Sequence, residues 1–88
     1  MASYSVSFKP SVEKDFRNLP KGTFSRVMLR IESLAENPFP PSFAKLVSAG
    51  RMYRVRAGDY RIVYEVDSNA GIVTVHYVRH RREVYRGM

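Results

Sequence analysis

Arginines recur in the segment YRVRAGDYRIVYEVD, residues 53–67, at spacings that place them on one face of a predicted β-hairpin. Side chains of a strand alternate between its two faces, so Arg54 and Arg56 point the same way, and Arg61 is expected to join them from the second arm. Like charges placed side by side on a small sheet cost stability. Guanidinium groups match the oxygens of a phosphate with paired donors. The pattern therefore predicts a face that binds phosphate groups and stabilises negative charge.

Proton transfer at such a face needs another group, because arginine stays protonated in practice. The segment HRREVYR, residues 80–86, offers His80 and Tyr85. Tyr85 lies among charged residues with no apolar run around it, which argues against a role in the core. Histidine has the better intrinsic pKa for neutral pH. On an extended chain, however, His80 shares the face of His76, opposite to Arg79.

The sequence predicts no metal site and no other cofactor. Two histidines four residues apart on a strand are about 13 Å apart, too far to share a metal ion. The chain has no cysteine, which excludes a disulfide and a thiolate metal site. It also lacks a glycine-rich phosphate loop, an H-E-x-x-H motif and a pair of carboxylates near a histidine.

Length and charge restrict the class of protein. The 88 residues are enough for one small domain spanning 1–88, and 44% of them are hydrophobic. The formal net charge is +7, which favours a polyanion or an acidic protein as partner. No apolar run is long enough to span a membrane, and the N-terminus does not read as a signal peptide. A cytoplasmic protein is the expectation.

The first half of the chain predicts a strand followed by two helices. Tyr4, Val6 and Phe8 alternate with serines, as in a half-buried strand. Pro10 suits the first turn of a helix, and Pro20 can open a second one. The second helix has an apolar stripe at helical spacing, made of Phe24, Val27, Met28, Ile31, Leu34 and Ala35. The segment NPFPP, residues 37–41, ends it.

Three strands are expected in the second half, at about 52–56, 60–66 and 72–79, after a loop in which Phe43 and Leu46 are predicted packing anchors. The order is β-α-α-β-β-β, an α+β fold with a helical hairpin packed on one face of a small, largely antiparallel sheet. Tyr53 and Val55 should face the helices. The arginines should then lie on the uncovered face.

These features together resemble the RelE/ParE toxin superfamily, on the RelE side. The resemblance covers nearly all of the chain and rests on the element order, on AKL followed by YRVRAGDYRIVYEVD, and on the terminal HRREVYR. The string GDYRIVY is typical of both branches. RelE-type toxins are ribosome-dependent messenger RNA endonucleases of type II toxin–antitoxin systems, whereas ParE-type toxins poison DNA gyrase. The resemblance implies the RelE-like fold, a cytoplasmic location, an acidic antitoxin, and the ribosomal A site with its message as partners.

The resemblance also implies roles for individual residues. RelE-like enzymes carry two basic residues on the second predicted strand, here Arg54 and Arg56, and an arginine after the tyrosine of the next, here Arg61. Their terminal tyrosine corresponds to Tyr85. A further arginine past the last strand falls on Arg81, or on Arg79 if the tail aligns without a gap. His80 is the second candidate for proton transfer, because some relatives carry a histidine near this place. Residues that would bind RNA beside the site are Lys45, Arg79 and Arg82.

Two departures from the family pattern bear on mechanism. The first basic pair is often lysine in the family and is arginine in this chain, which moves proton transfer onto Tyr85 or His80. The longer C-terminal helix of some members is not expected, because only three residues follow Tyr85 in this sequence. The implied reaction is metal-independent: the 2′-hydroxyl of RNA attacks the adjacent phosphate.

Two alternative functions remain open, a ParE-like inhibitor of DNA gyrase and a non-catalytic domain that binds RNA or an acidic partner.

Overall fold

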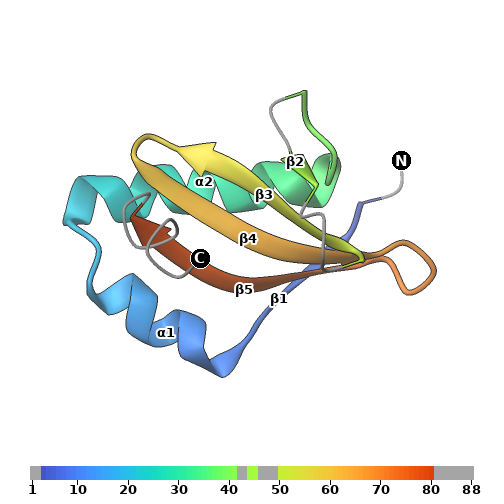
Figure 1. The fold of residues 1–88 in the computed structure, drawn as a ribbon, viewed down its shortest axis with the longest axis horizontal. Helices are drawn as coiled ribbons and strands as arrows, with labels where there is room; N and C mark the ends of the chain where they lie inside the picture. The colour runs from blue at the N-terminus through green and yellow to red at the C-terminus, as the bar shows by residue number, and fades with distance from the viewer. Residues whose placement is uncertain (1–2, 42–43, 46–49, 81–88) are drawn as a thin grey trace.

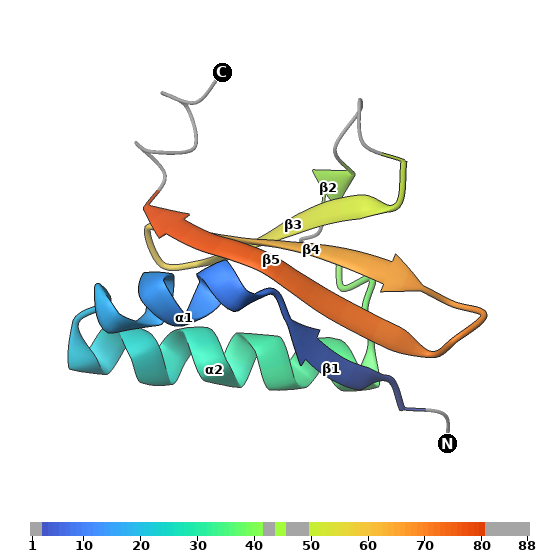
Figure 2. The ribbon, with the colours of Figure 1, turned by 90° about the horizontal axis from the view of Figure 1, so that it is seen from below.

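Two helices pack against one face of a five-stranded sheet in the computed structural model, which describes residues 3–41, 44–45 and 50–80 (Figure 1). Figure 2 shows the two layers edge on, with both helices on the same side of the sheet. The elements in chain order are β1 Ser5–Phe8, α1 Pro10–Arg17, α2 Lys21–Glu36, β2 Ala44–Lys45, β3 Met52–Ala57, β4 Tyr60–Asp67 and β5 Ile72–His80. The predicted α+β fold is confirmed.

Prolines set the ends of both helices. Pro10 occupies the first turn of α1, where its fixed φ suits the helix. Backbone N–H groups of the first turn have no partner within the helix, so the lack of an N–H in proline costs no hydrogen bond there. Pro20 is the N-cap residue, immediately before α2. The second helix ends at Glu36, because Asn37 stands before Pro38 and takes an extended conformation. Neither described helix combines the length and the apolar character needed to cross a membrane.

The core lies between α2 and the sheet. Val27, Ile31 and Leu34 of the predicted stripe are fully or almost fully buried. They pack into a cluster with residues of four elements: Val12, Val55, Ile62, Tyr64, Val66, Val73, Val75 and Val78. Phe24 departs from the prediction, because 39% of its surface is exposed. Its ring stands edge-to-face on Phe16 at 5.4 Å and joins α2 to α1 instead of filling the core.

The strand order is β1-β5-β4-β3-β2, so β4 is central. β1 runs parallel to β5, and the other neighbours are antiparallel. The prediction lacked β2, which consists of Ala44 and Lys45 paired with Arg54 and Tyr53. A strand of two residues has no periodicity that a sequence could show. The predicted anchors Phe43 and Leu46 lie outside the described residues.

A β-bulge in β5 changes which side chains share a face. Val63 lies opposite Tyr77 and Tyr64 lies opposite Val75, so His76 is the extra residue on β5. His76 contacts Glu65, whereas His80 lies opposite Tyr60. The face predicted to be common to His76 and His80 is therefore wrong, because the prediction assumed unbroken alternation along the strand.

One buried hydrogen bond ties the central strand to the end of α2. The Tyr64 hydroxyl donates to the Pro38 carbonyl oxygen at 2.7 Å, and the Tyr64 side chain is completely buried. Replacing Tyr64 with phenylalanine leaves that carbonyl without its donor. We expect the free energy of unfolding to fall by about 1–3 kcal/mol, measured by urea denaturation at neutral pH. An unchanged midpoint would show that the bond contributes no net stability.

The same tyrosine predicts a loss of stability in alkali. Burial, with a smaller contribution from Tyr53 and an opposing one from Arg30, raises the pKa of Tyr64 from 10.0 to about 12. The stabilisation from this raised pKa is complete below pH 10.0 and is lost as the pH rises towards 12. Urea midpoints across this range should fall more steeply for the wild type than for Tyr64→Phe. If the urea midpoints of the wild type and of Tyr64→Phe fall in parallel with pH, the loss of stability in alkali is due to other groups.

Candidate functional site

Three arginines stand side by side on the face of the sheet that is turned away from the helices, which we call the open face. Arg56 of β3 lies opposite Arg61 of β4, and Arg61 lies opposite Arg79 of β5. Directly opposite residues share a face, with Cβ atoms about 4.5–5.5 Å apart. Arg56, Arg61 and Arg79 therefore form one row across three strands, which we call the arginine row. The row can meet one phosphate group with several donors.

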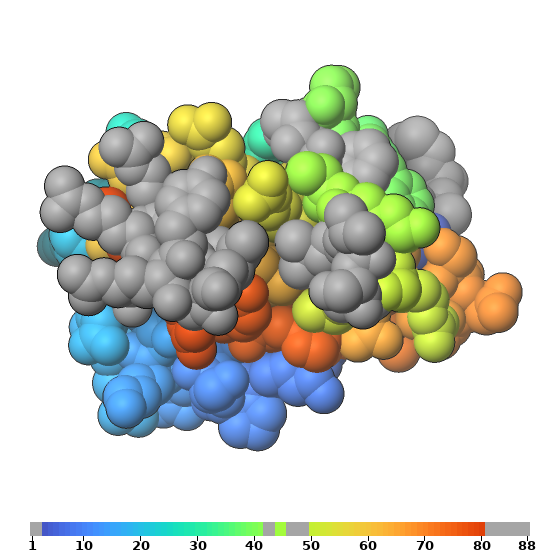
Figure 3. Space-filling model, in the orientation of Figure 1, coloured from blue at the N-terminus to red at the C-terminus, as the bar shows by residue number. Residues whose placement is uncertain are grey.

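The middle arginine is the least accessible of the row. Arg61 is only 7% exposed, whereas Arg56 and Arg79 are exposed. The Arg61 side chain is more buried than expected for a residue that points away from the helices. It lies at the centre of the row, with an arginine opposite it on each side. Figure 3 views the open face, where side chains of β3 and β5 reach the surface and α1 borders one side. Arg56 and Arg79 are therefore more accessible from solvent than Arg61.

A second row lies next to the first along the strands. Arg54 lies opposite Val63, which lies opposite Tyr77. The guanidinium of Arg79 stands over the Tyr77 ring, 4.5 Å from its centroid, in a cation–π contact that joins the two rows. Arg54 thus shares the open face with the arginine row, as predicted. Tyr77 was not predicted to belong to this surface, although its spacing of two from Arg79 on a strand is a signal for it.

Glu65 and His76 form an acid–base pair on the open face, beyond the second row. Glu65 Oε1 and His76 Nε2 are 3.0 Å apart, and both side chains are partly buried. Glu65 lies two residues from Val63 on β4, on the same face. The pair can exchange a proton, which the arginines cannot do. Sequence reasoning missed it, because the bulge that brings His76 to Glu65 leaves no pattern in the sequence.

Two other predicted site residues, His80 and Lys45, lie away from the open face. The His80 ring is on the helix side of the sheet, where it packs edge-to-face on Tyr60 at 5.3 Å. Lys45 lies opposite Tyr53, a core-facing residue, and so on the face opposite to Arg54. Neither side chain joins the arginine row. The remaining predicted residues, Arg81, Arg82 and Tyr85, lie outside the described residues.

Helix α1 fixes the end of β5 that carries Arg79. β1 pairs with β5 only as far as Phe8 and Val75, after which the chain turns into α1. There the backbone N–H of Val78 donates to Asp15 Oδ2 at 3.0 Å. The carboxylate of Asp15 thus replaces the missing neighbouring strand beside Arg79 and holds the outer end of the arginine row.

Comparison with known proteins finds relatives over most of the chain. The model of the family described as ParE toxin of type II toxin–antitoxin system, parDE, matches residues 6–85. The chain is 28% identical over 86 residues to a protein of Methanocaldococcus jannaschii called "Putative toxin RelE1", covering 94% of this chain and 96% of that protein.

Solved structures of two toxin–antitoxin complexes are similar to the chain over its length. A chain of the RelE–RelB complex of Pyrococcus horikoshii OT3 gives a TM-score of 0.80 at 28% identity, covering 90% of this chain and 96% of that one. The RelBE2 complex of Mycobacterium tuberculosis gives 0.79 at 25% identity, covering 90% and 99%. The RelE-like fold and the resemblance stated from the sequence are both confirmed. With a family match over residues 6–85, the chain belongs to the ParE toxin family of type II toxin–antitoxin systems, within the RelE/ParE superfamily.

Proposed function

We propose that this toxin is a ribosome-dependent, metal-independent endonuclease that cleaves messenger RNA and so inhibits translation in the cytoplasm. The observation that carries the proposal is the arginine row. Arg56, Arg61 and Arg79 stand directly opposite one another, an arrangement that costs a sheet stability between like charges. Such an arrangement suits a surface that must hold a phosphate while its negative charge grows.

The proposed reaction uses the nucleophile that RNA itself carries. The 2′-oxygen forms a bond to the adjacent phosphorus while the bond from phosphorus to the 5′-oxygen breaks. The products are a 2′,3′-cyclic phosphate and a free 5′-hydroxyl. In this scheme Arg56 and Arg79 bind the phosphate, and Arg61 stabilises the charge of the phosphorane. Arg54, from the second row, binds a neighbouring phosphate of the message.

One proton must leave the 2′-hydroxyl and another must reach the 5′-oxygen. Tyr85 is the proposed principal group for this transfer, as the family pattern implies. His80 becomes a weaker candidate than the sequence indicated, because its ring packs on Tyr60 at the helix side. The Glu65–His76 pair lies on the same face as the arginine row, but Glu65 is four residues from Arg61 along β4, about 13 Å, which is beyond hydrogen-bond reach of a phosphate held by the row.

An acidic antitoxin is the proposed cytoplasmic partner. The similar structures from Pyrococcus horikoshii and Mycobacterium tuberculosis are complexes of a toxin with its antitoxin. A net charge of +7 on 88 residues gives the present chain a strong attraction for an acidic polypeptide. An uninhibited endonuclease would also harm the cell that makes it. The ribosomal A site with its message is the proposed target.

Inhibition of DNA gyrase is the second candidate function. The description of the matching family as ParE toxin of parDE favours it. The arginine row favours RNA cleavage, because gyrase inhibition by binding requires no convergence of cations on one phosphate. A non-catalytic domain that binds RNA or an acidic partner remains the third candidate.

Expression of the chain in cells separates these functions. We expect new 5′ ends of messages within translated codons, mapped by primer extension soon after induction. Messages without a start codon should stay intact, because the ribosome must position the RNA. Growth arrest with intact messages and relaxed plasmid DNA would instead support the inhibition of gyrase.

A further inference from the structure

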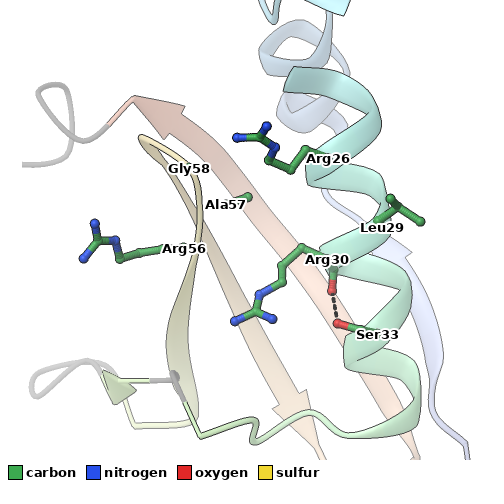
Figure 4. Close-up of a pocket in the computed structure, with 7 residues that line it drawn as sticks. All are labelled: Arg26, Leu29, Arg30, Ser33, Arg56, Ala57 and Gly58. Atoms are coloured by element: carbon green, nitrogen blue, oxygen red, sulfur yellow. Dashed lines mark hydrogen bonds between the residues drawn. The ribbon is translucent and has the colours of Figure 1, made fainter. Parts of the chain in front are cut away.

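A basic groove lies on the helix side of the molecule, between α2 and the hairpin of β3 and β4 (Figure 4). Its volume is about 390 Å³, and the described residues that line it include no acidic one. They are Arg26, Leu29, Arg30, Ser33, Arg56, Ala57 and Gly58. The groove is separate from the open face, because α2 covers the other side of the sheet.

Two arginines of α2 supply the charge of the groove. Arg26 and Arg30 are four residues apart, so they lie on one side of the helix. Both side chains extend from α2 towards β3, whereas the Arg56 side chain leaves β3 in the opposite direction (Figure 4). An occupant of the groove therefore meets two neighbouring guanidinium groups, each able to bind a carboxylate.

Gly58, in the turn between β3 and β4, lies next to the Arg26 side chain. Gly58 has a φ of +63°, which favours glycine, and a Cβ atom at this position would lie 3.2 Å from Arg26 Nη1. Because glycine has no side chain, the guanidinium can lie close to the turn and forms one wall of the groove. The position of Arg26 thus depends on the turn as well as on α2.

An exposed leucine gives the groove an apolar component. Leu29 is 67% exposed, more than any other large hydrophobic side chain in the described part of the chain. It lies in the same turn of α2 as Arg26 and Arg30. The phosphate and ribose of RNA make little favourable contact with an apolar side chain such as Leu29. A peptide with both acidic and apolar residues can bind Arg26 and Arg30 through carboxylates and pack on Leu29. The composition therefore favours an acidic peptide segment over RNA.

We propose that this groove binds an acidic segment of the antitoxin, with carboxylates on Arg26 and Arg30 and an apolar side chain on Leu29. The inference rests on the antitoxin partner proposed above. Arg56 borders the groove, but its side chain leaves β3 on the opposite side and belongs to the arginine row. A segment seated in the groove therefore binds on the other side of β3 and does not itself occupy that row.

The proposal is tested by measuring how tightly the full chain binds a labelled peptide of repeated Glu-Leu-Ser units. A labelled oligouridine of equal charge is the comparison. Fluorescence anisotropy reports both dissociation constants. Arg26→Glu should weaken peptide binding about tenfold or more, because it opposes a carboxylate at the site. Lys21→Glu makes the same change in net charge on an exposed position of α2 outside the groove, and should have a much smaller effect.

Leu29→Ser separates the groove from general electrostatics, because it changes no charge and alters an exposed position. It should weaken the peptide several-fold and leave the oligouridine unchanged. Equal losses in Arg26→Glu and Lys21→Glu, or an unchanged peptide in Leu29→Ser, would overturn the proposal. A loss confined to the oligouridine would assign the groove to RNA instead. These measurements involve no ribosome and no cleavage, so their failure is distinguishable from failure of the proposed function.

Discussion

Replacing Arg61 with methionine is expected to lower the rate of message cleavage on ribosomes by about 10²–10³-fold, the usual effect of losing one charge-stabilising donor. Arg61 is the middle member of the arginine row, with Arg56 and Arg79 opposite it on either side. Methionine suits this position because Arg61 is only 7% exposed, and a flexible apolar side chain keeps part of its volume. The measurement is single-turnover cleavage on programmed ribosomes.

Two controls separate charge from packing at this position. Arg17→Met removes an exposed arginine of α1, whose partner Glu13 lies on the same helix, and should leave the rate unchanged. Arg61→Ala should lose as much activity as Arg61→Met, with a melting temperature within a few degrees of the wild type. Removal of the middle of three like charges also relieves repulsion. If Arg61→Met unfolds, Arg61 is structural. If Arg61→Met stays folded and keeps full activity, the assigned role of Arg61 in charge stabilisation is wrong.

Loss of the Tyr85 hydroxyl is expected to have the next largest effect. Tyr85→Phe removes a single oxygen, and cleavage should slow by about 10²-fold or more if that oxygen transfers a proton. His80→Gln should have a much smaller effect, because the His80 ring packs on Tyr60 away from the arginine row. Single-turnover rates for the two variants, measured across a pH range, provide the comparison.

The Glu65–His76 pair supplies a control on the same face. His76→Gln should leave the rate nearly unchanged, because Glu65 lies about 13 Å along β4 from Arg61. A larger effect of His80→Gln than of Tyr85→Phe would contradict the ranking of Tyr85 above His80. Mild effects in all three variants would mean that the arginine row and the ribosome account for nearly all of the rate.

Local periodicity made most of the fold predictable. The alternation of Tyr53 and Val55 with Arg54 and Arg56 gave the correct faces of β3, because one face of that strand is buried. The helices followed from prolines and an apolar stripe of helical spacing. The strand β2 and the bulge at His76 were not predictable, since both depend on pairing with a neighbouring strand rather than on a pattern within their own segment.

The sequence predicted the face of the sheet on which the arginines lie. It did not predict which arginines stand opposite one another on neighbouring strands. The turn at Gly58 has two residues, which places Arg56 opposite Arg61. The position of Arg79 depends on the register of β5 with β4, which the bulge shifts between Val63 and Tyr64. The groove beside Arg26 and Arg30 arises from packing between a helix and a hairpin turn, so spacing along the sequence does not reveal it.

Incubation of the purified toxin with ribosomes that hold a defined codon in the A site tests the central claim most directly. The chemistry of the cleaved ends is read together with the site of cleavage. We expect one cut within the A-site codon that leaves a 2′,3′-cyclic phosphate and a 5′-hydroxyl, and that Arg61→Met slows by about 10²–10³-fold. An intact message, or a cut that Arg61→Met makes at the wild-type rate, would contradict the account.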